Sequence, residues 1–257
     1  MSINVQHMAL VIADISGYTR FTKYHSMALL HAEQIISDLI EAVIDSSDHP
    51  LKVNKLEGDA VFFYAESQGD NYALCAAVKT QAVKFFEAFQ AKAEEVLRNP
   101  VCWCSACQNA GELHLKVVAH FGEVAMKKVK TFEELAGEPV IRLYRLLKNS
   151  LKSSEYFMMT NEFHRLAGDV GDMRRESRTE NAEGIGAVSV QVFYPQGQIL
   201  ADVSAAPKAG WGKRLAQYWR VNWYAILRFF RLRPKQTFAH LPYKTAQTTQ
   251  TVELPKV

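Results

Sequence analysis

The sequence of 257 residues has no long hydrophobic run and little cysteine. A membrane-spanning helix needs about 18 to 20 consecutive apolar residues, and no window of the chain reaches that length. The first residues also lack the basic stretch followed by an apolar one that marks a secretory signal. The four cysteines, three of them crowded within six residues, are unlike a disulfide scaffold. We therefore expect a cytoplasmic protein with reduced thiols.

Acidic residues are missing from one long segment, which divides the chain by charge. Residues 203–252 contain nine lysines or arginines and no aspartate or glutamate, although the whole chain has a net charge of only +3. Glu253 and Lys256 cancel, so the part of the chain before this segment carries a net charge of −6. Such an asymmetry predicts a folded domain over residues 1–200 and a linker with a basic tail over residues 201–257.

Hydrophobic periodicity predicts blocks of strands and helices. Short apolar runs bounded by turn residues predict strands, and apolar residues spaced by three and four predict helices. The predicted strands cover residues 5–14, 51–55, 60–65, 113–122, 123–129, 156–160 and 186–194. The predicted helices cover residues 18–45, 71–98 and 139–150. Because strands and helices do not alternate one by one, we expect an α+β fold with an antiparallel-rich sheet and helices on one face.

Two aspartates stand at the ends of predicted strands. Asp14 closes the first apolar strand, and Asp59 lies in a predicted hairpin turn behind Gly58. If the two strands are neighbours, the carboxylates converge, and paired carboxylates beside a glycine are suited to Mg²⁺ with a nucleoside triphosphate. Taken singly, each aspartate has a local explanation, Asp14 as a helix cap and Asp59 as a turn residue.

Four short motifs occur in a fixed order. They are Ala13-Asp14-Ile15-Ser16-Gly17-Tyr18-Thr19, Lys55-Leu56-Glu57-Gly58-Asp59-Ala60, His120-Phe121-Gly122-Glu123-Val124 and the segment from Gly137 to Arg145. Each is weak alone, but the ordered set, over about residues 5–196, resembles the catalytic domain of class III nucleotidyl cyclases. The resemblance implies a ferredoxin-like sheet covered by helices, and a head-to-tail homodimer with active sites in the shared cleft.

The resemblance also implies roles for individual residues. The implied ligands of two Mg²⁺ or Mn²⁺ ions are Asp14, Asp59 and the backbone carbonyl of Ile15. The implied substrate-binding residues are Lys55, Glu134, Gly17, Tyr18 and Thr19. Adenylate cyclases carry a lysine at the position of Lys55, which makes ATP the expected substrate. The expected reaction converts ATP to 3′,5′-cyclic AMP and pyrophosphate by two-metal catalysis.

Two positions of the last motif leave alternatives open. Arg145 falls where the family carries the arginine that stabilises the pentavalent phosphate, although Arg142, Arg145 and Lys148 also repeat as a basic helix surface would. Ile141 stands where family members carry an asparagine that orients the ribose. Loss of such a positioning hydrogen bond slows a reaction by orders of magnitude. The alternative to an active enzyme is a degenerate cyclase-like module that binds a nucleotide or a partner and is attached to a membrane surface through its tail.

A cluster of cysteines lies in the predicted loop 101–108. Its members are Cys102, Cys104 and Cys107. Three thiols so close together can bind a structural Zn²⁺, with His114 or Cys75 as the fourth ligand. A reversible disulfide is a second interpretation, and small, partly buried residues without any ligand are a third. A metal-sensing or redox adaptor is the function that the first two interpretations would give.

The segment 211–233 contains three of the four tryptophans and six lysines or arginines. It predicts a C-terminal amphipathic helix, because the aromatic and the basic side chains fall on opposite faces. This composition is typical of a helix that lies on an anionic membrane surface, here the inner membrane face. Docking on the acidic body is an alternative. A nucleic acid is not expected, since no known nucleic-acid-binding motif accompanies the basic residues.

Overall fold

The computed structural model describes residues 3–24, 29–99, 105–130 and 132–195. The chain divides into the units Met1–Arg214 and Leu215–Val257, and the second lies outside the described residues. The predicted tail helix 211–233 and the domain boundary at residue 200 also lie outside them, so both stay predictions. Within the described ranges, no helix combines the length and the apolar character needed to cross a bilayer.

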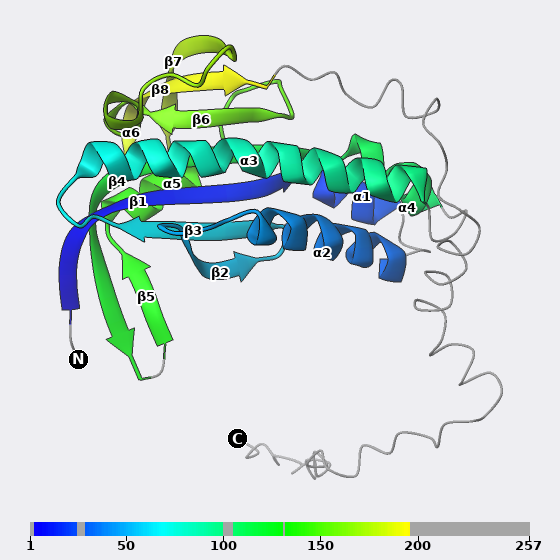
Figure 1. Ribbon diagram of the computed structural model, residues 1–257, viewed down its shortest axis with the longest axis horizontal. Helices are drawn as coiled ribbons and strands as arrows, with labels where there is room; N and C mark the ends of the chain where they lie inside the picture. Colours follow the sequence, from blue (N-terminus) through cyan, green and yellow to red (C-terminus); the bar gives the residue numbers. More distant parts are fainter. Residues whose placement is uncertain (1–2, 25–28, 100–104, 131, 196–257) are drawn as a thin grey trace, which may run out of the picture. The chain divides into compact units, whose positions relative to one another are not determined.

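The described strands form one eight-stranded sheet (Figure 1). The strands are β1 (Ile3–Ser16), β2 (Lys52–Glu57), β3 (Ala60–Glu66), β4 (His114–Val129), β5 (Phe132–Ala136), β6 (Tyr156–Thr160), β7 (Arg174–Ala182) and β8 (Gly186–Tyr194). The helices are α1 (Tyr18–Tyr24), α2 (Leu29–Asp45), α3 (Asn71–Arg98), α4 (Ser105–Gln108), the 3₁₀ helix η2 (Ala110–Glu112), α5 (Glu138–Leu146) and α6 (Asn161–Ala167). The sheet order is β2-β3-β1-β4-β6-β8-β7, with β5 paired to β4 beside this row. Strands β4 and β6 are parallel, and the other described pairs are antiparallel.

Strand β1 lies inside the sheet and separates two hydrophobic cores. Its residues 8–13 are at most 2% exposed, because successive side chains point to opposite faces and both faces are covered. The odd-numbered residues of this run pack in one core with α2, α3 and α6. The even-numbered residues pack in a second core with α5. Figure 1 shows the long helix α3 running across the first of these faces.

The predicted α+β fold class is confirmed, with the addition that α5 covers the face opposite the other helices. The helix predicted over residues 71–98 has those bounds in the structure. Asp70 begins it, because its carboxylate accepts a hydrogen bond from the backbone nitrogen of Ala73 (2.9 Å). The strand predictions 51–55, 60–65, 156–160 and 186–194 are each matched to within two residues.

Other boundaries were predicted wrongly. Residues 113–122 and 123–129 form the single strand β4, because Gly122 continues the strand instead of turning the chain. The helix predicted over 18–45 is two helices, α1 and α2, with residues 25–28 outside the described part. Helix α5 ends at Leu146 rather than residue 150. Periodicity did not predict β5, α6 or β7, because β5 and α6 are short and β7 is a largely exposed edge strand of polar residues.

Gly122 lets α5 approach the sheet closely. A Cβ atom at this position would lie 2.8 Å from Cγ of Pro139 at the start of α5, and 3.1 Å from Nε2 of His120. The buried His120 ring in turn hydrogen-bonds the Thr160 hydroxyl (2.8 Å), and burial followed by the charge of Arg142 lowers the pKa of His120 to about 4. The glycine of the His120-Phe121-Gly122 motif is therefore explained by packing.

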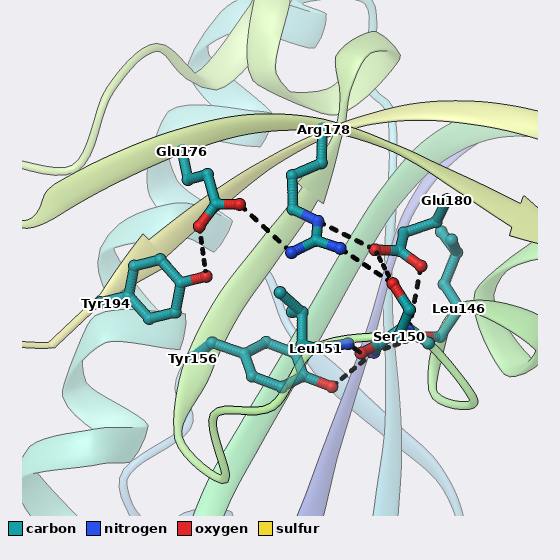
Figure 2. Close-up of polar contacts among 9 residues, drawn as sticks. Leu146, Ser150, Leu151, Tyr156, Glu176, Arg178, Glu180 and Tyr194 are labelled. Atoms are coloured by element: carbon teal, nitrogen blue, oxygen red, sulfur yellow. Dashed lines mark hydrogen bonds and ion pairs between the residues drawn. The ribbon is translucent and has the colours of Figure 1, made fainter.

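A polar network joins the loop after α5 to strand β7 (Figure 2). The Glu180 side chain, only 5% exposed, accepts hydrogen bonds from the backbone nitrogen (3.0 Å) and hydroxyl (3.1 Å) of Ser150. Arg178 pairs with Glu180 (3.0 Å) and Glu176 (3.2 Å), and it donates to the Ser150 hydroxyl (2.8 Å). The loop is therefore fixed by charge-assisted hydrogen bonds to a buried carboxylate.

The same loop is tied to α5 and β6 by Asn149. Its side-chain nitrogen donates to the carbonyl of Leu146 (2.7 Å) and to the hydroxyl of Tyr156 (2.6 Å). Its side-chain oxygen accepts from the backbone nitrogen of Leu151 (3.0 Å). Asn149 thus satisfies a carbonyl at the C-terminal end of α5, which has no partner within the helix.

We expect Glu180→Ala to lower the free energy of unfolding by about 2 kcal/mol, because the Ser150 amide and the Arg178 guanidinium lose a buried acceptor. The measurement is urea denaturation followed by circular dichroism. Thr179→Ala, at an exposed position of the same strand, is the control and should change stability by less than about 0.5 kcal/mol. Equal losses of unfolding free energy in the two variants would show that the contacts of Glu180 do not stabilise the fold.

Candidate functional site

The strand registers bring Asp14 and Asp59 together at one end of the sheet. Asp14 on β1 lies opposite Ala60 on β3 and opposite Lys116 on β4. Asp59 immediately precedes Ala60 in the turn between β2 and β3, and its carbonyl accepts a hydrogen bond from the backbone nitrogen of Ile15 (3.1 Å). The structure thus places the two carboxylates and the Ile15 backbone in one cluster, while their metal-binding role stays a prediction.

Lys116 is a part of this cluster that the sequence did not reveal. Its Nζ lies 2.5 Å from Oδ2 of Asp14, and the two side chains are only 20% and 16% exposed. An ion pair so far removed from water is screened weakly. Only the pairing of β1 with β4 shows that Lys116 faces Asp14, because 101 residues separate them in the chain.

Asp59 is the most strongly perturbed carboxyl group of the cluster. Burial and the nearby Asp14 carboxylate raise its pKa from 3.8 to about 6, against the opposing charge of Lys116. The negative charge of Glu33 on α2 raises the pKa of Asp59 further. Glu33 also accepts a hydrogen bond from the Tyr18 hydroxyl (3.2 Å). Burial and Glu33 together raise the pKa of Tyr18. The sequence does not identify Glu33 as a site residue, because nothing in the sequence distinguishes it from a solvent-facing helix residue.

Gly17 and Thr19 flank Tyr18 at the start of α1. Gly17 has φ of +93°, a conformation that favours glycine, and its carbonyl accepts from the backbone nitrogen of Phe21 (2.8 Å). A Cβ atom there would lie 3.2 Å from the carbonyl oxygen of Glu112. The backbone of Thr19 accepts a hydrogen bond from the Thr22 hydroxyl (3.3 Å). These contacts explain the glycine by the turn from β1 into α1.

The donor chemistry of the cluster fits Mg²⁺ or Mn²⁺. Both ions prefer oxygen ligands, use one or two carboxylates, and complete their coordination with water and phosphate oxygens. Asp14, Asp59 and the Ile15 carbonyl can supply such oxygens. Within the described ranges, no group of three or more His, Cys, Asp or Glu side chains is arranged to hold a metal ion. An ion held by two carboxylates would need further oxygen ligands from water or phosphate.

Lys55 and its neighbours form a second group on the face covered by α5. Lys55 on β2 lies 2.9 Å from Glu57, and Glu57 accepts a hydrogen bond from the hydroxyl of Tyr144 on α5 (2.9 Å). Glu134 on β5 lies 4.0 Å from Lys127 on β4, and its charge also raises the pKa of Tyr144. The structure thus places Lys55 and Glu134 around Tyr144, which the sequence did not single out.

Arg145 follows Tyr144 on α5 and is paired differently from the other arginine of the helix. Arg145 lies 2.6 Å from Glu183 in the turn between β7 and β8, with 40% and 84% of the two side chains exposed. Arg142 is bound by both Glu138 and Glu162 at 2.9 Å. Because Arg142 is held by two carboxylates, the alternative of a uniform basic surface is weakened. Ile141, where an asparagine was expected, is 54% exposed.

The predicted zinc site lies only partly in the described residues. Cys102 and Cys104 fall outside them. Cys107 is 3% exposed and packs in the core with α3. Burial raises the pKa of the Cys75 thiol to about 12, which disfavours the thiolate that zinc binds. The zinc and redox interpretations of the cluster stay predictions.

The raised pKa of Asp59 predicts how stability depends on pH. The folded state holds this proton more tightly than the unfolded state, so stability in the presence of a chelator should fall as pH rises from about 4 to about 6. Asp59→Asn should therefore have a higher melting temperature than the parent above pH 6, and a similar one below pH 4. Glu87→Gln, an exposed carboxylate on α3, is the control and should show no such window. A lower melting temperature for Asp59→Asn than for the parent at pH 7 would contradict a raised pKa of Asp59.

Lys116 should weaken the binding of a divalent cation, because its ammonium group lies against a carboxylate oxygen of the site. We expect Lys116→Met to bind Mn²⁺ about tenfold more tightly in calorimetric titration, and to melt at a lower temperature when a chelator is present. The matched control is Lys128→Met, an exposed lysine of the same strand. Unchanged or weaker Mn²⁺ binding by Lys116→Met would show that the lysine does not compete with the ion.

Two comparisons connect the chain to other sequences. The model of a family described as a protein of unknown function (DUF2652) matches residues 36–156. The uncharacterized protein Rv2561/Rv2562 of Mycobacterium tuberculosis is 35% identical over 154 residues, which make up 60% of this chain and 70% of that protein.

Solved structures show the fold. The adenylyl cyclase CyaB from P. aeruginosa matches with a TM-score of 0.57 and 13% identity, over 78% of this chain and 100% of that one. The guanylyl cyclase Cya2 matches with a TM-score of 0.55 and 13% identity, over the same shares. A class III adenylyl cyclase-like ATP-binding protein from Pseudomonas aeruginosa matches with a TM-score of 0.51 and 17% identity, over 64% of this chain and 35% of that one. The chain therefore has the fold of cyclase catalytic domains, and by sequence it belongs to the same protein family as Rv2561/Rv2562 of Mycobacterium tuberculosis.

Proposed function

We propose that this protein is a class III nucleotidyl cyclase that converts ATP to 3′,5′-cyclic AMP and pyrophosphate as a homodimer. The observation that carries the proposal is the convergence of Asp14 and Asp59 at one end of a cyclase-like sheet. Lys55 on β2 supplies a further charged group on the face that α5 covers, and Arg145 on α5 is a partly exposed arginine that pairs with Glu183. Each of these residues stands in one of the four ordered motifs.

The residues have separate tasks in this proposal. Asp14, Asp59 and the backbone carbonyl of Ile15 would hold two Mg²⁺ or Mn²⁺ ions, which would activate the ribose 3′-hydroxyl and neutralise the phosphates. The 3′-hydroxyl gives its proton to water as its oxygen forms a bond to the α-phosphorus, the bond from that phosphorus to the bridging oxygen breaks, and pyrophosphate leaves. Arg145 supports the phosphate charge through its planar, permanently charged guanidinium group. For this role Arg145 must separate from Glu183, which costs little because an ion pair so exposed to solvent is weak.

Exposed apolar side chains support a homodimer. Leu56 on the edge strand β2 is 58% exposed, Val53 on the same strand is 41% exposed, and Ile141 on α5 is 54% exposed. Burying such groups against a second chain is favourable. An edge strand also offers unpaired backbone groups to a partner.

A second function is favoured by Ile141. Its exposed apolar side chain on α5 cannot donate the hydrogen bond to the ribose that the resemblance expects from an asparagine. A cyclase-like module that binds a nucleotide without turnover, and acts through its basic tail, is the function consistent with that loss.

The test uses the purified full-length protein with ATP, GTP, CTP or UTP and either Mg²⁺ or Mn²⁺, and identifies products by mass spectrometry. We expect cyclic AMP from ATP, and at least about a hundredfold less from Asp14→Asn, because the variant loses a charged metal ligand. Glu87→Gln serves as the matched control for a removed carboxylate and should keep the activity.

The outcomes separate the two functions. Binding of ATP without any cyclic product, by a folded dimer, would favour the module without turnover. A cyclic product from another nucleotide in preference to ATP would overturn the assignment of the substrate. Equal activity of Asp14→Asn and the parent would overturn the assignment of the metal site.

A further inference from the structure

Lys55 and Glu57 present a donor and an acceptor side by side. They are two residues apart on β2, so their side chains project from the same face of the strand. Lys55 Nζ lies 2.9 Å from Oε1 of Glu57. They pair with Phe62 and Ala60 on β3, and both of these belong to the core under α5. The two charged groups therefore stand at the edge of that core.

Tyr144 on α5 fixes the Glu57 carboxylate from the other side. Its hydroxyl donates to Oε1 of Glu57 at 2.9 Å, and its ring packs edge-on against Phe62 with the ring centroids 5.6 Å apart. The Lys55 ammonium lies 5.6 Å from the centre of the same ring. Burial and the bond to Glu57 raise the pKa of Tyr144, so the hydroxyl keeps its proton and remains a donor.

The carboxylate of Glu57 remains an acceptor. It is held by the Lys55 ammonium and the Tyr144 hydroxyl, which each lie 2.9 Å from Oε1. Glu134, the residue that the resemblance places beside the base, instead faces Lys127 at 4.0 Å with 54% of its side chain exposed. Glu57 is thus the carboxylate that lies next to Lys55.

We propose that Glu57, held in place by Tyr144, reads the 6-amino group of adenine while Lys55 donates to the ring nitrogen N1. This inference rests on the proposed function, and it moves the second base-reading role from Glu134 to Glu57. Lys55 and Tyr144 both bind Oε1, so Oε2 is the atom we assign to the base. Adenine presents one donor group on this edge, which one oxygen can accept, whereas guanine presents two neighbouring donors that call for both oxygens of a carboxylate.

The variant Glu57→Gln makes a directional test. Lys55 and Tyr144 are both donors, so they hold the amide oxygen of the glutamine and turn its NH₂ group toward the base. An NH₂ group is mismatched with the amino group of adenine but matched with the oxygen O6 of guanine. Lys55 still donates toward N1, which is an acceptor in adenine but carries a hydrogen in guanine, so the expected result is a loss of the preference for adenine rather than a preference for guanine. A merely structural role of Glu57 would leave the preference in place.

The experiment measures calorimetric binding of 3′-deoxy-ATP and 3′-deoxy-GTP, which lack the attacking hydroxyl, to the full-length protein with Mg²⁺. We expect the parent to favour 3′-deoxy-ATP by about tenfold or more, and Glu57→Gln to bind the two nucleotides with affinities within about threefold of each other. Tyr144→Phe keeps both charges and should weaken the parent's preference severalfold. Glu133→Gln, an exposed neighbour on β5, should keep that preference. Melting curves confirm that each variant is folded.

Two outcomes separate this inference from the proposed function. If the parent binds and cyclises ATP but Glu57→Gln keeps its adenine preference, or Glu134→Gln loses it instead, the role of Glu57 is overturned and the cyclase assignment stands. If the parent binds neither nucleotide and forms no cyclic product, the proposed function fails and the inference fails with it.

Discussion

The candidate site depends on the register of β1 with its two neighbours. Paired positions place Glu57, Ala60, Asp14, Lys116 and Tyr156 in one row across five adjacent strands. Strands lie about 4.8 Å apart, so Glu57 and Asp14, two strands apart, have Cα atoms separated by roughly 10 Å. A slip of one residue would turn the side chains of the slipped strand to the opposite face. The buried run of residues 8–13 prevents such a slip, because a slip would move each of its apolar side chains into the opposite core, where the space is already filled.

The two faces of the sheet have different tasks. One face is covered by α2, α3 and α6 and holds the larger core, so packing explains the buried apolar residues on this face. The other face is covered by α5, which carries Tyr144 and Arg145 as well as core residues. Gly122 lets the start of α5 approach the sheet, and Asn149 ties down its end. A helix fixed at both ends keeps the Tyr144 hydroxyl in position to donate to Glu57 on β2.

The sequence could predict the parts that depend on local pattern. Apolar periodicity located α3 to the residue and β3 to within one residue, and the ordered motifs indicated both aspartates, Lys55 and the cyclase-like fold. It could not indicate Lys116 or Glu33, because their place beside Asp14 and Asp59 arises from pairing between strands and packing of α2, which leave no local signature. Tyr144 was missed for a related reason, since one aromatic residue on an amphipathic helix indicates core packing unless its partner across the sheet is known.

Most charged side chains of the candidate site are paired with an opposite charge within the described residues. The ion pairs are Asp14–Lys116, Lys55–Glu57 and Arg145–Glu183. In the proposed function, a polyphosphate with its cations would have to exchange these partners, and the free-energy cost of each exchange follows the exposure of the pair. The second and third pairs have side chains 40% exposed or more, so water replaces the lost partner at little cost. The pair of Asp14 with Lys116 is at most 20% exposed, and separating it leaves two poorly hydrated charges. In that proposal, separating Lys116 from Asp14 costs more free energy than separating the other two pairs. A divalent cation delivered together with phosphate oxygens would compensate both charges at once, the carboxylate through the cation and the ammonium through the phosphate.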